Sequence, residues 1–270
     1  MSENSRHILR REPTFVRSLQ LQISVIAALF LRDIIARFGR HGLGFLWLFL
    51  EPMLFAIGVT ILWAFMRHFG GSIPIAGFIL TGYSALVMLR NMVNRLMTST
   101  SANKGLLYHR NVKVMDLIYA RAFMEFVACS GSLFFLTFIF SGLGLMELPE
   151  DPLQAIFAWL LYCWCCFSLS MCAAFMGESS EIFERVAHVL MYLAMPLSGA
   201  FTMLNWLPPA AQEFLSYSPL VNGVEMLREA YFGVGVSAQY SVGYLIQFNL
   251  CMTLVGLILV RSIRRQLIDS

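Results

Sequence analysis

Six long stretches of the sequence lack Asp, Glu, Lys and Arg altogether, and they constrain the fold more than any motif does. A helix needs roughly 20 apolar residues to cross the hydrocarbon core of a bilayer. Only helices and closed barrels satisfy all their backbone hydrogen bonds there. The charged fraction is 13%, about half of what a soluble domain carries. We therefore predict an all-α polytopic membrane protein with six transmembrane helices, at about 43–66, 73–97, 117–141, 153–177, 184–204 and 241–260.

The basic residues predict the orientation of these helices. If the N-terminus is inside, 17 of the 19 Lys and Arg residues fall on inner segments, and only Arg67 and Arg228 fall outside. Such a bias is typical of cytoplasmic loops. We expect both termini in the cytoplasm, with tails at 1–42 and 261–270. The net charge of +3 then reflects topology and indicates no nucleic-acid partner.

The segment that precedes the first expected span reads SLQLQISVIAALFL, residues 18–31, between Arg17 and Arg32. It is too short to cross the bilayer comfortably, and it predicts an amphipathic helix lying in the inner interface. The alternative is an uncleaved first span, which would invert the topology. No repeat or linker divides the chain, so we expect a single transmembrane domain over 1–270.

The sequence lacks the motifs of the main enzyme classes. No Gly-Lys dipeptide occurs, which excludes a phosphate-binding GxxxxGK[ST] loop, and no HExxH zinc motif is present. No GxSxG elbow supports a serine nucleophile. The six cysteines all fall inside expected spans and are interpreted as small apolar residues. We predict no catalytic residue and no metal site, so any uphill transport needs ATP hydrolysis by a partner.

Two inner loops are candidates for contact with such a partner. Residues 101–125 begin with a polar turn, continue through a short apolar patch at 106–108 and carry several basic residues. They fit either a docking element or an ordinary basic loop held against anionic lipid. Residues 177–188 place Ser179 or Ser180 to cap a helix. Arg121 and Glu125 are four residues apart and are expected to pair.

The outer segment 205–240 predicts two short helices, at about 210–217 and 220–232. Helices this short cannot cross a bilayer, but they can enter it and return if they pack against protein. Pro208 and Pro219 punctuate them, and Glu225 and Arg228 are spaced to form a local pair. The segment is interpreted as an interfacial hairpin or as a gate at the outer mouth.

Glu51 lies about eight residues, or ~12 Å, from the inner end of the first expected span. Arg90 lies at nearly the same depth in the second. Ionisable groups at this depth are costly unless they are paired or face water. We expect Glu51 and Arg90 to face each other, or to share an inner vestibule with Asn91, Asn94 and Arg95. A purely structural ion pair is the alternative.

The sequence resembles the membrane subunits of type-2 ABC exporters, in the capsular-polysaccharide branch. The resemblance lies in RFGRHGLGFLWLFLEPM (37–53), LTGYSALVMLRN, NKGLLYHRNVKVMDLIYARAFME and MPLSGAFTMLNWLPPAAQEFLSYSPLVNGVEMLREAYFG (195–233). It covers nearly the whole chain after about residue 15. The Cys-rich fourth span is particular to this sequence.

The resemblance implies an assembly of two copies of this chain with two separate ABC ATPase subunits, which bind ATP and Mg. The interfacial helix (about 18–38) and the 177–185 loop would contact the ATPase, and residues 205–233 would form two re-entrant helices at the exit. A periplasmic adaptor and an outer-membrane polysaccharide exporter would receive the lipid-linked polymer from the inner membrane. The residues implied in ATPase coupling are Asn103, Lys104, Gly105, Leu106, Leu107, Tyr108, His109, Arg110, Glu178 and Glu181.

The leading hypothesis is therefore the non-enzymatic membrane subunit of a capsular-polysaccharide exporter. An exporter of O-antigen or teichoic acid, or a lipid or drug exporter of the same superfamily, is the alternative. A membrane-embedded enzyme and a scaffold for complex assembly are the alternatives from other classes.

The charge-exchange variant Glu51→Arg with Arg90→Glu tests the expected pair. Each single change should lower the amount of folded protein in the membrane, because it places two like charges at one depth. The double variant should restore that amount, as measured by immunoblotting of membrane fractions. No recovery in the double variant would contradict pairing.

Overall fold

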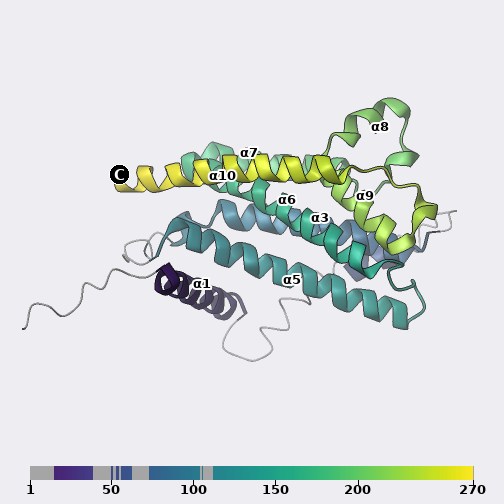
Figure 1. The fold of residues 1–270 in the computed structure, drawn as a ribbon, viewed down its shortest axis with the longest axis horizontal. Coiled ribbons are helices and arrows are strands. Elements are labelled where there is room, and N and C mark those ends of the chain that lie inside the picture. Colours follow the sequence, from purple (N-terminus) through teal and green to yellow (C-terminus); the bar gives the residue numbers. More distant parts are fainter. Residues whose placement is uncertain are drawn as a thin grey trace, which may run out of the picture.

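The computed structural model describes residues 15–38, 50, 53–54, 56–62, 73–103, 105 and 112–269. Within this part of the chain, all regular structure is helical. Figure 1 shows the long helices side by side, with the C-terminus at one end of the bundle and α8 and α9 at the other.

Four helices are long and apolar enough to cross a membrane. They are α3 (Ile75–Met97), α5 (Val114–Gly142), α6 (Pro152–Ser179) and the first 22 residues of α10 (Val242–Asp269). At 1.5 Å per residue each exceeds the ~30 Å hydrocarbon core. The spans expected at 73–97, 117–141, 153–177 and 241–260 are confirmed as helices of membrane length.

The other two expected spans have different outcomes. The span expected at 184–204 is a shorter helix, α7 (Glu181–Leu197), of 17 residues. It ends early because Gly199 adopts a positive φ of 72°, which turns the chain out of the helix. The span expected at 43–66 lies mostly outside the described residues, although 53–54 and 56–62 are helical.

Helix α6 is the centre of the bundle and packs against α3, α10 and α9 (Pro219–Phe232). Buried polar side chains tie it to two of these neighbours. Tyr162 Oη donates to Ala85 O on α3 at 2.9 Å, and Asn249 Nδ2 on α10 donates to Leu161 O at 3.1 Å. Such bonds satisfy polar groups that would be costly in a bilayer.

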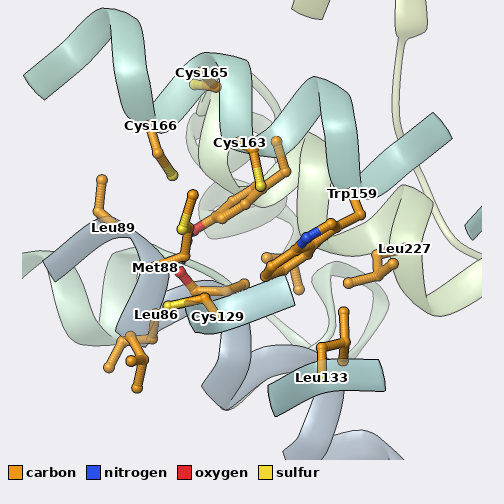
Figure 2. Close-up of a cluster of buried hydrophobic side chains, with 14 of the residues drawn as sticks. Leu86, Met88, Leu89, Cys129, Leu133, Trp159, Cys163, Cys165, Cys166 and Leu227 are labelled. Carbon is orange, nitrogen blue, oxygen red and sulfur yellow. Dashed lines mark hydrogen bonds between the residues drawn. The ribbon is translucent and has the colours of Figure 1, made fainter. Parts of the chain in front are cut away.

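The cysteines of α6 lie in this core. Figure 2 shows Cys163 and Cys166 pointing from α6 into the same cluster as Cys129 of α5 and Met88 of α3. None of the six forms a disulfide, and four are fully buried. Their interpretation as small apolar residues agrees with this packing.

Helix α1 (Phe15–Phe38) lies along the first half of α5 (Figure 1). Leu29 packs against Leu117 and Ala120, and Phe30 and Ile34 pack against Met124 and Ala128. Elsewhere on α1, Leu19, Leu21, Ile23, Leu31 and Ile35 are exposed. The helix expected at about 18–38 is thus present and docks on α5.

Gly223 of α9 provides a test of this packing. A Cβ at this position would lie 2.7 Å from Tyr162 Cδ2, and the Tyr162 ring is fixed by its bond to Ala85. We expect Gly223→Ala to lower the free energy of unfolding by about 1–3 kcal/mol. Thermal unfolding in detergent measures the change.

Gly243→Ala is the matched control, because no atom lies within 4 Å of that Cβ and the residue is also helical. Its melting temperature should stay at or slightly above that of the unchanged protein. Equal melting temperatures for the two variants would contradict the close approach of α9 to α6.

Candidate functional site

The sequence predicts ATPase contacts on two loops, 101–125 and 177–188, and the helices that precede these loops, α3 and α6, end close together in the structure. Helix α3 ends at Met97 and α6 ends at Ser179, and Gly177 approaches so closely that a Cβ would lie 2.7 Å from Met97 O. We call residues 98–103, 105, 112–113 and 178–181 the polar end. It lies at the same end of the bundle as the C-terminus (Figure 1).

Helix α1 is tied to the polar end by hydrogen bonds. Arg32 Nη2 donates to Asn103 Oδ1 at 2.7 Å and to Asp33 Oδ1 at 2.6 Å. Asn103 Nδ2 in turn donates to Ser99 O at 2.9 Å. Asn103 is buried, and its side chain holds the turn after α3 in place.

Arg121 of α5 joins the same network. Its Nε lies 3.6 Å from Asp33 Oδ2, and its Nη1 donates to Arg95 O at 2.9 Å. Gln22 of α1 donates to Asp116 Oδ1 at 2.7 Å, and the other oxygen of Asp116 accepts from Lys113 N at the start of α5. Helix α1, the end of α3 and the start of α5 therefore form one connected unit.

The pair expected between Arg121 and Glu125 is wrong. Glu125 is fully buried, and its Oε1 lies 3.2 Å from Arg95 Nε on α3. Spacing along one helix allows an i,i+4 pair, but the neighbouring helices offer both side chains nearer partners. A buried carboxylate needs such a partner to offset its desolvation.

The remaining predicted inner residues have mixed outcomes. Gly105 is exposed and helical, Glu178 is half-buried, and α7 begins at Glu181. Ser180 Oγ accepts from Ile182 N at 3.2 Å, so the expected cap of α7 is present. Arg95 pairs with Glu125, and Arg90 is half-buried. Lys104, Leu106, Leu107, Tyr108, His109, Arg110 and Glu51 lie outside the described residues.

The opposite end of the bundle carries the two short helices expected from the sequence, α8 (Pro209–Ser216) and α9. Pro208 immediately precedes α8, and Pro219 is the first residue of α9, where proline is favoured. Helix α8 exposes Phe214, whereas most of α9 is buried against α6 and α3.

Arg228 of α9 makes several contacts at this end. Its side chain is fully buried, and it donates to three carbonyl oxygens after the end of α7: Gly199 at 2.7 Å, Ala200 at 2.7 Å and Thr202 at 2.9 Å. Its guanidinium carbon also lies 3.9 Å above the Phe78 ring of α3. We call this set of contacts the Arg228 anchor.

The expected pair between Glu225 and Arg228 is present, with Oε1 and Nη1 4.0 Å apart. Glu225 also accepts hydrogen bonds from Leu204 N at 3.1 Å and Gln239 N at 3.4 Å. Both residues lie between the membrane-length helices.

Comparison with known proteins identifies the family. The model of the ABC-2 type transporter membrane family matches residues 24–232, from α1 to the end of α9. The chain belongs to the ABC-2 type transporter family. Both the polar end and the Arg228 anchor lie inside the matched region. No group of His, Cys, Asp and Glu side chains in the described part of the chain could hold a metal ion.

Several curated relatives align over almost their full length. The chain is 36% identical to the capsule polysaccharide export inner-membrane protein BexB of Haemophilus influenzae, over 93% of this chain and 95% of that protein. It is 38% identical to the corresponding protein CtrC of Neisseria meningitidis, over 92% and 94%. It is 28% identical to the polysialic acid transport protein KpsM of Escherichia coli, over 93% and 98%.

Replacing Arg228 with lysine tests the anchor. A lysine ammonium cannot reproduce the planar fork that serves three carbonyls and stacks on Phe78. We expect Arg228→Lys to cost about 2 kcal/mol or more of stability, measured by thermal unfolding in detergent. Arg261→Lys, at an exposed position of α10, should leave the melting temperature unchanged. Equal effects of the two changes would argue against the anchor.

Proposed function

We propose that this protein is the membrane subunit of an ATP-driven exporter that moves lipid-linked capsular polysaccharide across the bacterial inner membrane. The observation that carries the proposal is the 36–38% identity to two capsule polysaccharide export inner-membrane proteins over more than nine-tenths of the chain. The more distant relative is a polysialic acid transport protein, and by its name it transports an acidic polymer.

The proposed assembly contains two copies of this chain and two ABC ATPase subunits. The ATPase binds at the polar end, where residues 103–114 form the coupling segment and residues 177–185 add a second contact. The unit made of α1, the end of α3 and the start of α5 supports this assignment. Direct hydrogen bonds join these three helices, so a displacement of the coupling segment would be transmitted to all of them. The exporter itself needs no catalytic residue in this chain.

The proposed orientation places the polar end and both termini in the cytoplasm. Six spans then cross the membrane, and α8 and α9 form a re-entrant pair at the outer exit, from which a periplasmic adaptor and an outer-membrane exporter take the polymer. The burial of α9 against the long helices supports a position within the membrane, because a peripheral hairpin would leave it exposed.

Deletion of the gene in its source bacterium tests the function. We expect capsule polymer to accumulate inside the cells and to disappear from the surface, as detected with a capsule-specific probe before and after cell permeabilisation. A plasmid copy of the unchanged gene should restore surface polymer.

The same deletion strain separates the polymers. Normal surface capsule together with loss of O-antigen or teichoic acid from the surface would replace capsule with that polymer as the substrate. Normal surface levels of all three would overturn the proposed class of substrate.

A further inference from the structure

An elongated apolar groove of about 430 Å³ lies between α5 and α6. Helix α9 and the connection between α5 and α6 supply its other walls. Figure 2 shows three of its lining side chains converging from different helices: Leu133 from α5, Trp159 from α6 and Leu227 from α9. The two long helices touch each other little, which leaves the space open.

One face of α5 and one face of α6 line the groove. On α5 the lining residues run from Phe126 to Phe138 at helical spacing, which spans about 18 Å along the axis. On α6 they run from Pro152 to Leu160. Small side chains, Ser130 and Ala155, stand where bulky ones would close the gap. The groove therefore runs parallel to the membrane-length helices.

The polar groups in the groove bond to one another. Trp159 Nε1 donates to Ser130 Oγ at 2.8 Å, and Thr137 Oγ1 and Tyr231 Oη lie 2.9 Å apart as a hydrogen-bonded pair. A sugar placed here would lose its hydration without gaining partners for its hydroxyl groups. The lining instead suits a saturated hydrocarbon chain.

The groove opens sideways onto a surface of exposed apolar residues. Phe134 and Ile156 at its edge are each 59% exposed, and Phe138 and Leu160 lie beside them. With α5 and α6 crossing the bilayer as proposed, residues at this exposure would contact its hydrocarbon. An acyl chain can enter from the bilayer without crossing a polar barrier.

The charges at the α9 end of the groove favour one class of headgroup. Glu147, Glu150 and Asp151 lie exposed on the connection that also supplies Leu148, Pro149 and Pro152 to the lining. Across the described segments 142–152 and 198–241, Arg228 is the sole basic residue, and it is fully buried. An anionic headgroup would be repelled here, whereas an ammonium group would be attracted.

We propose that this groove is a binding site for an acyl chain of a zwitterionic phospholipid with an ammonium headgroup, of the phosphatidylethanolamine type, in the leaflet on the α9 side. The bound chain completes the packing of α9 through Leu227 and Tyr231. The proposal concerns a resident membrane lipid and does not rest on the exported polymer.

Native mass spectrometry of the full chain tests the site. The protein is released from nanodiscs that contain equal amounts of phosphatidylethanolamine and phosphatidylglycerol. We expect one retained phosphatidylethanolamine per chain. Ala155→Phe fills the groove and should lower the retained fraction about tenfold, because the acyl chain loses the contact of more than one CH₂ group.

Three further variants test whether loss of the lipid results from filling the groove. Ile156→Trp also narrows the groove from an exposed position, so it should lose the lipid without loss of folding. Leu153→Phe, 78% exposed and outside the lining, should retain it. Equal retention in all variants, or preferred retention of phosphatidylglycerol, would overturn the proposal. Cross-linking between two copies through Ile156→Cys would also overturn it, because the groove would then be a subunit interface.

Discussion

The buried guanidinium of Arg228 is the constraint on which the arrangement of the α9 end depends. A cation without solvent must find acceptors, and residues 198–203 after α7 present backbone carbonyl oxygens that lie outside any helix. Arg228 satisfies three of them and stacks on Phe78 of α3. Gly82 is required beside it, because a Cβ there would lie 2.0 Å from Ala200 O. The position of α9, the end of α7 and the face of α3 are therefore fixed together, and Glu225 fixes residues 204 and 239 to the same point.

At the polar end, charged side chains also need partners, and carboxylates on other helices provide them. Arg95, in the last turn of α3, pairs with Glu125 of α5. Arg121, in the first third of α5, pairs with Asp33 of α1. Helix α3 takes part in both places, through Phe78 and Gly82 at one end and Arg95 at the other. A force applied to the polar end by an ATPase therefore meets a helix that also contacts the Arg228 anchor. In the proposed exporter, α3 therefore links the end of the bundle where the ATPase binds to the end where the polymer leaves.

Local pattern predicted more of the fold than of the site. The charge-free stretches predicted the four membrane-length helices of the described chain, and the proline positions predicted the starts of α8 and α9. Length, apolarity and proline are properties of a single segment, so they can be read without knowing its neighbours. The Glu225–Arg228 pair was visible as an i,i+3 spacing. The Arg95–Glu125 and Arg121–Asp33 contacts join helices far apart in sequence, and i,i+4 spacing indicated the wrong partner. The three acceptors of Arg228 are backbone carbonyl oxygens, which every residue has, so no residue type in the sequence predicts these contacts. The groove arises from small residues on α5 and α6, whose significance depends on which faces meet.

In the proposed exporter, the polar end faces a separate ATPase. Photo-cross-linking tests it most directly, with a photoreactive amino acid placed at Gly105 on the polar end or at Gly235 near the opposite end, both of them exposed. We expect a cross-link from position 105 to a nucleotide-binding subunit in intact cells and none from position 235. A cross-link to that subunit from position 235 but not from 105 would contradict it.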